Sequence, residues 1–458
     1  MQTEKVLSGG INPKSSKTGG ELGKVLKTKD LVIFGLVFMA PVSAQTLFGE
    51  LSVLSQGHAV LSYLFALVAM LFTASSYGVM AGTFPKAGST YSYTSQAIHP
   101  YVGFVAGWAI LLDYLVMPIL LTKLSATFLM ELLPFIPLWF MLLLFLIPIT
   151  VFNYYGTKLT ARVNLFMTVA MLLSLVLFIG FAIKNLVSDG GAGAIFSFQG
   201  VINSNTFSSG VVLSGASIAV LSYLGFDAVT TMAEDSKVTG KMVGTAAVIS
   251  LLFASFFYIL QVYFATLVMP DFTSFGSQDT AFFEIATLVG GSALATICTL
   301  IIAVSGISTG LAGQSAGSRI LFGMGRDKVL PKFFAHVHEK YKTPSNSIII
   351  LAILGYVGAL FLPLDFIFSI MVFGALTGFM CVNLSVVVEF FFKRKIRQGS
   401  KLFLHFIFPA FGILICGFIM INMDVIGLIA GVTWIAIGTT LLIARIKYFK
   451  VNENLDWS

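Results

Sequence analysis

The chain has 458 residues, of which 57% are hydrophobic and 10% are charged, and its formal net charge is +7. A soluble globular domain carries about 25% charged residues, so this composition excludes a soluble protein. Apolar runs of about 18 or more residues recur along the whole length, and roughly 20 helical residues cross the hydrocarbon core of a bilayer. Because helices satisfy their own backbone hydrogen bonds in lipid, the sequence predicts an all-α integral membrane protein.

Residues 1–29 are polar and rich in Gly, Ser and Lys, without the apolar core of a signal peptide, so we expect a cytoplasmic tail. Apolar runs separated by Gly, Pro and charge clusters then predict about twelve transmembrane helices. These spans are expected near 31–55, 60–83, 101–131, 135–153, 160–184, 209–234, 242–269, 289–320, 345–363, 366–392, 402–422 and 425–445. Residues 449–458 are expected to form a second cytoplasmic tail.

The basic residues alternate strictly between the two sides of these spans. With the N-terminus inside, the cytoplasmic side receives Lys24, Lys27, Lys29, Lys86, Lys158, Arg162, Lys237, Lys241, the 326–342 and 393–401 clusters, Arg445, Lys447 and Lys450. The opposite side receives almost only Lys184. The positive-inside rule therefore predicts an even number of spans in the cell membrane, with both termini cytoplasmic. Topology explains the net charge, and we expect no binding of nucleic acid.

The first span contains a polar interruption in the segment MAPVSAQTLFGE, residues 39–50. Pro41 removes a backbone donor there, and Ser43, Gln45 and Thr46 follow it. The sixth span contains a second interruption, LSYLGFDAVTTMAED, residues 221–235, where Gly225 and Asp227 lie at mid-depth.

Spans one and six are equivalent positions if spans one to five and six to ten are inverted repeats. Each repeat would then begin with a discontinuous helix that lines a binding site at the bilayer midplane. An unwound turn exposes backbone N–H and C=O groups, and the ends of half-helices carry partial charges that bind a charged ligand. The alternative is that Pro41 and Gly225 are simple kinks of the kind that membrane helices often contain.

Two acidic residues lie deep in the predicted membrane region. Placing a charged Asp at the bilayer centre costs roughly 2.5 to 3.5 kcal/mol, so Asp227 should face a cavity or have a partner. It is expected to cap a half-helix that begins at Ala228, to attract a substrate cation or to carry a coupling proton, and these roles are compatible. Asp113, in span three, is the second deep acid.

Aromatic side chains near these acids either bind an ammonium group through their faces or pack the bundle. They are Trp108, Tyr114, Tyr223 and Phe226. Glu50 follows the first break, whereas Glu234 and Asp235 are expected at the cytoplasmic boundary.

Other polar groups give weaker signals. Ser305, Ser308 and Thr309 in span eight either line an ion site or bond their own backbone. His336 and His338 have no Cys or carboxylate companions, and Cys298, Cys381 and Cys416 lie singly in apolar segments, so we expect no metal and no cofactor. No Walker loop, GxSxG or HExxH motif is present, and the chain is not expected to be an enzyme.

The chain resembles the amino acid/polyamine/organocation permeases over nearly its whole length. The resemblance is carried by KTKDLVIFGLVFMAP, FPKAGSTYSYTSQAIHPYVGFVAGWAILLDYL, LGFDAVTTMAED and GMGRDKVLPKFFAHVHEKYKTPSNS. Within that family LLDYL and LGFDAVTT are most similar to the putrescine importers. The resemblance implies the five-plus-five inverted-repeat (LeuT-like) fold, with substrate between spans one, three, six, eight and ten. The transporter domain is then 30–448, with repeat one at about 30–184, repeat two at about 207–392 and two extra helices at about 401–446.

The family's site, carried onto this sequence, consists of the span-one break, the span-six break and the Asp113 region. Its predicted substrate-binding residues are Ala40, Pro41, Ser43, Gln45, Thr46, Asp113, Tyr114, Ser222, Tyr223, Gly225, Phe226 and Asp227. Two departures from the family matter. PVSAQ replaces a glycine-rich turn that holds a substrate carboxylate in many members, and Thr46 stands where putrescine importers have an acid. A lysine that some proton-coupled members have in span five is missing around Ala170 and Met171.

The sequence leads to two transport hypotheses and one from another class. The first is a secondary active importer of putrescine or a related amine that works by alternating access, with the proton as the expected coupling ion. The second is proton-coupled uptake of a neutral or zwitterionic amino acid, with its carboxylate on Ser43, Gln45 and backbone amides. A sensor or a channel is the third class. The expected partners are the small-molecule substrate and the lipid bilayer, without an obligate protein partner.

Overall fold

A computed structural model describes residues 27–84, 89–155, 160–231, 237–326 and 330–449, and every regular element in these ranges is a helix. The two tails up to residue 26 and from residue 450 lie outside them. Lys86, Lys158, Glu234 and Asp235 also lie outside the described residues.

The predicted bundle of about twelve helices is confirmed. Among the described residues, ten helices are long and apolar enough to cross a membrane, a bent pair at the start makes an eleventh span, and Ser345–Phe361 is a shorter apolar helix of 17 residues. The spans in order are α1 to α3 (Thr28–Met39, Ser43–Thr46, Phe48–Leu54), α4 (Ala59–Thr83), α6 (Pro100–Met130), α7 (Leu138–Tyr155), α8 (Thr160–Gly190), α9 with α10 (Ser209–Tyr223, Ala228–Thr231), α11 (Gly240–Val268), α12 (Ala281–Arg326), α13 (Ser345–Phe361), α14 with η4 (Leu364–Val386, Val387–Lys393), α15, η5 and α16 (Ser400–Leu402, Phe403–Ile407, Phe408–Ile421), and α17 (Val425–Phe449). Short connecting helices are α5 (Ser89–Ala97), η1 (Ala192–Phe196), η2 (Phe198–Gly200) and η3 (Lys332–Ala335).

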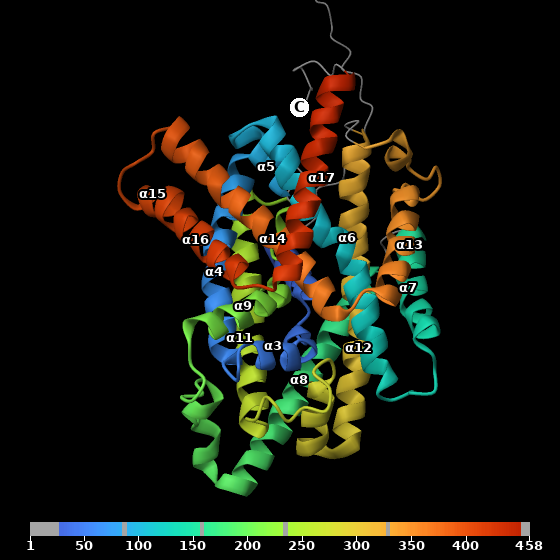
Figure 1. Cartoon of the computed structure of the whole chain (residues 1–458), viewed down its shortest axis with the longest axis vertical. Helices are drawn as coiled ribbons and strands as arrows, with labels where there is room; N and C mark the ends of the chain where they lie inside the picture. Colours follow the sequence, from blue (N-terminus) through green and yellow to red (C-terminus); the bar gives the residue numbers. More distant parts are fainter. Residues whose placement is uncertain (1–26, 85–88, 156–159, 232–236, 327–329, 450–458) are drawn as a thin grey trace, which may run out of the picture.

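The core of the bundle is formed by α6, α14 and α9, whereas α16 and α17 lie at its periphery (Figure 1). The buried share of the central apolar window is 83% in α6 and 17% in α17. Apolar side chains on α17 are therefore available to lipid, while those on α6 pack against protein. The most enclosed helices are the ones that carry the predicted site.

Span one is broken where the sequence predicts. α1 ends at Met39, and Ala40 has a φ of +49°, which interrupts the helix directly before Pro41. The four residues of α2 follow, and Thr28–Thr46 and Phe48–Leu54 are bent by 63° relative to each other. The interruption therefore extends beyond the proline, from Ala40 to Leu47.

Span six is also broken, between Tyr223 and Ala228. Gly225 has a φ of +111°, and a Cβ built on it would lie 2.1 Å from Cδ1 of Phe38 in α1. Only glycine fits this close approach with this backbone conformation. The two breaks therefore touch each other in the middle of the bundle.

Span eight differs from the sequence prediction at its start. The structure has one element from Ala281 to Arg326, interrupted at Gly291, whose φ is +68°. Residues 281–290 thus form a helical segment of their own before the span, although the prediction began the span at 289. The physical reason is that a left-handed glycine redirects the chain without changing the hydrophobicity of the run.

Candidate functional site

A cavity lies between the two broken helices and enters the bundle at mid-depth. Its walls come from the span-one break, α6, the C-terminal turn of α9 with the span-six break, α12 and α14. The cavity volume is about 60 Å³. A water molecule needs roughly 10–15 Å³ of such space, so the cavity has room for only a few waters in this structure.

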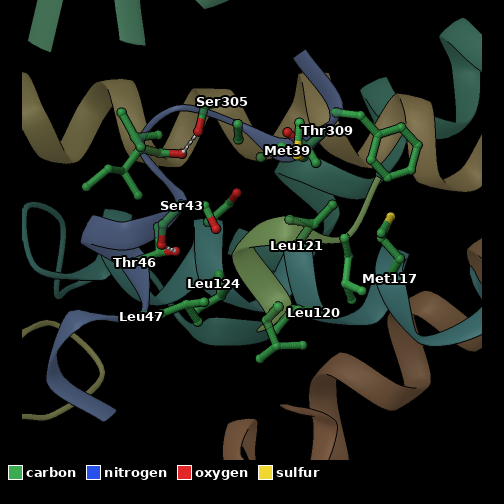
Figure 2. A pocket seen from close by; sticks show the side chains of 18 of the residues that line it. Met39, Ser43, Thr46, Leu47, Met117, Leu120, Leu121, Leu124, Ser305 and Thr309 are labelled. Carbon is green, nitrogen blue, oxygen red and sulfur yellow. Dashed lines mark hydrogen bonds between the residues drawn. The ribbon is translucent and has the colours of Figure 1, made fainter. Parts of the chain in front are cut away.

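The cavity wall is largely aliphatic. Figure 2 shows Met117, Leu120, Leu121 and Leu124 of α6 facing the span-one break. The remaining lining residues are Phe38, Met39, Ala40, Val42, Ser43, Thr46, Leu47, Ser125, Leu221, Leu224, Ile302, Ser305, Gly306, Thr309 and Met371. None of these described lining residues is charged. The wall therefore suits an alkyl chain, with polar contacts at a few points only.

Hydroxyl groups supply those polar points, from Ser43, Thr46, Ser125, Ser305 and Thr309. Thr46 donates to the Ser43 carbonyl at 2.8 Å, and Ser305 donates to the Ile302 carbonyl at 2.7 Å. A hydroxyl that donates to its own helix still has lone pairs to accept a bond from a ligand. Thr309 Oγ1 is buried without a partner among the described residues.

Of the twelve predicted residues, Ala40, Ser43 and Thr46 line the cavity. Ser222 lies directly behind the wall, because its Oγ accepts from Ser43 Oγ at 3.1 Å and lies 2.7 Å from the Tyr63 hydroxyl. This contact joins the two breaks through their side chains.

Pro41 and Gln45 are not part of the wall. The Pro41 carbonyl accepts from Gln261 Nε2 of α11 at 2.9 Å, so this amide supports the break. Both side-chain polar atoms of Gln45 are buried without a hydrogen-bond partner in the described part of the chain.

Tyr258 in α11 contacts both breaks and was not among the residues predicted from the sequence. Its hydroxyl lies 2.5 Å from the Met39 carbonyl oxygen and 2.8 Å from the Ser222 carbonyl oxygen. These carbonyls are at the ends of α1 and α9, where the helix leaves such groups without an internal donor. The predicted Tyr223 lies on the same side, and its hydroxyl donates to the Tyr63 carbonyl at 3.2 Å.

Asp227 is 2% exposed, and its carboxylate lies behind the cavity wall. Oδ1 accepts from the Gly225 backbone N–H at 3.3 Å, and Oδ2 accepts from the Tyr114 hydroxyl at 3.1 Å. The side chain therefore closes the span-six turn and links it to α6.

Asp113 is also 2% exposed, and its Oδ1 has no hydrogen-bond partner among the described residues. The charges of Asp113 and Asp227 act on each other, and Tyr114 lies within reach of both. Among the described groups around this pair we find no cationic side chain. Phe226 packs beside it, with its ring 5.6 Å from Tyr77 and 5.2 Å from Phe379.

Trp108 packs away from the site. Its ring stacks on Trp434 of α17 at 4.6 Å, and each indole N–H donates to the other residue's carbonyl at 2.8 Å. Trp108 therefore attaches the last helix to α6.

A second polar group of residues lies beyond the cavity, toward the end of the bundle opposite the C-terminus. Lys123 donates to the Leu362 carbonyl, and the charges of Asp279 and Asp365 act on it. Burial, followed by the nearby Asp365, raises the pKa of Asp279, and Lys123 opposes that rise. The charges of Asp365 and Asp279 also act on Glu50. Within the described residues no group of three or more His, Cys, Asp or Glu is arranged to hold a metal ion.

A helical bundle with two interrupted spans around a small buried cavity defines a membrane transporter. The comparisons with known proteins agree, because the model of the amino acid permease family matches residues 41–451. The chain belongs to that family, and its relatives are transporters and not enzymes.

Individual relatives cover nearly the whole chain. The low-affinity putrescine importer PlaP of Escherichia coli strain K12 is 32% identical over 453 residues, which are 97% of this chain and 98% of the relative. The branched-chain amino acid permease BcaP of Bacillus subtilis strain 168 is 25% identical over 95% of this chain and 96% of its own. Among solved structures, a Na⁺-coupled sialic acid symporter matches with a TM-score of 0.59 at 13% identity, covering 87% of this chain and 90% of that one. The last likeness shows the fold and confirms the predicted architecture.

Proposed function

We propose that this protein is a secondary active transporter that imports a small amine, putrescine or a related polyamine, by alternating access. The observation that carries the proposal is the cavity wall, in which aliphatic side chains alternate with hydroxyls and no described residue is cationic. An alkyl diamine fits such a wall, since its methylene chain packs on Met117 and the leucines. Its ammonium groups are donors only, and the hydroxyl oxygens of Ser43 and Thr46 accept from them.

The buried carboxylates support a role for cations in the cycle. Asp113 and Asp227 are both enclosed without a positive side chain among their described neighbours, and a charged carboxylate is costly at such a position. We infer that this pair holds the coupling proton and extends a negative field toward the cavity floor. For a cation that enters a cell with a negative interior, the membrane potential adds about 2.3 kcal/mol per charge per 100 mV.

Uptake of labelled putrescine into proteoliposomes tests the proposal. The double variant Asp113→Asn and Asp227→Asn is expected to lose proton-driven uptake, while Asp271→Asn, in an exposed loop, is expected to keep it. If the double variant still takes up putrescine at the natural rate, neither carboxylate is needed for transport.

Uptake of a neutral or zwitterionic amino acid with a proton is the second candidate function. The unpartnered amide of Gln45 beside the break favours it, since that amide has donors for a carboxylate. A competition panel separates the two candidates. Inhibition by putrescine and not by alanine, serine or glutamate is expected, and the reverse pattern would replace the first proposal with the second.

A further inference from the structure

The segment that joins span ten to span eleven is strongly basic. This segment, residues 387–407, consists of η4, a turn, α15 and η5, and we call it the α14–α15 elbow. It contains one acid, Glu389, and five cationic residues, which are Lys393, Arg394, Lys395, Arg397 and Lys401. Figure 1 shows the elbow projecting from the side of the bundle.

The two arginines of the elbow are held in place by aromatic rings. Arg394 forms an ion pair with Glu389 at 2.8 Å, and its guanidinium lies 4.9 Å from the centre of the Phe390 ring. The guanidinium of Arg397 lies 4.7 Å from the Phe391 ring, and its Nε donates to the Phe391 carbonyl at 3.2 Å. Such contacts restrict a side chain that is otherwise mobile, so the charges have fixed positions before any ligand arrives.

A buried imidazole lies beside these charges. His405 is 8% exposed, its ring stacks on Phe390 at 4.3 Å, and its Nδ1 has no hydrogen-bond partner in the described chain. The charges of Lys401 and Arg394 act on this ring. A buried nitrogen without a partner, next to Lys401, which has no acidic partner among the described residues, indicates an anionic ligand that supplies oxygen atoms.

Apolar side chains flank the basic cluster. Phe392 is 56% exposed and Phe403 is 53% exposed, at the two ends of the turn that contains the cations. Rings that face acyl chains next to cations at headgroup level match an amphipathic ligand rather than a soluble ion.

We propose that the α14–α15 elbow binds the phosphate group of an anionic membrane phospholipid. Lys395, Arg397 and Lys401 have no acidic partner among the described residues, so their charges are available for the phosphate oxygens. The elbow continues directly into α14, which carries Met371 of the cavity wall. A bound lipid therefore holds the end of a helix that shapes the site.

Thermal denaturation of the purified full-length protein in a neutral detergent tests this proposal without any substrate. Phosphatidylglycerol is titrated against the natural chain and the triple variant Lys395→Gln, Arg397→Gln and Lys401→Gln. We expect the lipid to raise the melting temperature of the natural chain, and its half-saturating concentration to be about 100-fold higher for the variant. The double variant Lys340→Gln and Lys342→Gln, in another basic loop where Lys340 also lies over an aromatic ring, is expected to respond like the natural chain.

Three outcomes would overturn the proposal: an unchanged response of the triple variant, an equal response to phosphatidylcholine, or equal protection by soluble glycerol phosphate. The last result would assign the site to a free phosphate ester. If the triple variant does not fold, Lys401→Gln alone, at an exposed position, is expected to raise the half-saturating concentration about fivefold. Because no transport is measured, a negative result in this experiment would not contradict the proposed function. A negative result in the putrescine-uptake experiment would likewise not contradict lipid binding at the elbow.

Discussion

Single residues set the geometry of the two breaks, and Gly225 has the tightest steric constraint among them. Its φ of +111° lies where side chains with a Cβ are rarely found, and Phe38 of α1 occupies the space that a methyl group would need. The same residue gives its N–H to Asp227. One glycine therefore determines how closely α1 approaches the span-six turn and where the Asp227 carboxylate lies.

The variant Gly225→Ala is expected to destabilise the protein by about 1–3 kcal/mol through backbone strain alone, with the clash against Phe38 adding to this. Putrescine uptake should fall with it, because both breaks shift. The measurement is the melting temperature together with uptake into proteoliposomes. Gly180→Ala in α8 is the control, since a Cβ there meets nothing within 4 Å. Equal melting temperatures for the two variants would contradict the steric argument.

At the level of elements, the two broken helices are joined by a third helix that is continuous. The hydroxyl of Tyr258 in α11 lies against carbonyls at the end of α1 and at the end of α9, and Ser43 bonds to Ser222 from one break to the other. These groups make the two breaks a single unit with α11 as its support. A change in one break is therefore transmitted to the other by direct hydrogen bonds.

Removing the Tyr258 hydroxyl tests this coupling. Tyr258→Phe leaves buried carbonyls without their donor, which costs about 1–3 kcal/mol. We expect a lower melting temperature and a higher KM for putrescine. Tyr263→Phe, in the same helix, removes a hydroxyl that bonds to carbonyls of Ile195 and Ser197 in a loop, and its KM should not change. A KM for Tyr258→Phe equal to that of the natural chain would show that the two breaks act separately.

The positions of both breaks were predictable because Pro41 and Gly225 act on their own backbone. The aliphatic wall of the cavity was not, since Leu121 and Leu124 have the same hydrophobicity whether they face lipid, protein or a substrate. The sequence indicates that Asp113 and Asp227 lie far from the ends of their spans. It does not indicate how their helices are rotated about their axes. Neither residue is part of the cavity wall, and hydrogen bonds from Tyr114 and the Gly225 N–H hold the Asp227 carboxylate in its position.

For the whole molecule, the distribution of charge and burial gives a consistent picture of a bundle in a bilayer. α6 is enclosed on nearly all sides, whereas α17 packs on α14 and, through the Trp108–Trp434 pair, on α6, and presents apolar residues outward. The loop 269–280 has two acids and no Lys or Arg, whereas the loop that contains η3 and residues 336–343 is basic. These two loops are at opposite ends of the bundle, so the side of the membrane on which each lies gives the orientation of the protein.

Cysteine labelling of intact cells tests the proposed orientation, in which the basic loops are cytoplasmic. Ser277→Cys and Lys340→Cys place thiols at exposed positions in the acidic and the basic loop. The native Cys298 and Cys416 are buried and Cys381 is partly buried, so the natural chain is the background control. A membrane-impermeant maleimide should label position 277 in intact cells and position 340 only after permeabilisation. Labelling of position 340 alone in intact cells would invert the bundle relative to the membrane. The membrane potential would still drive a cation inward, because that driving force does not depend on the orientation of the protein.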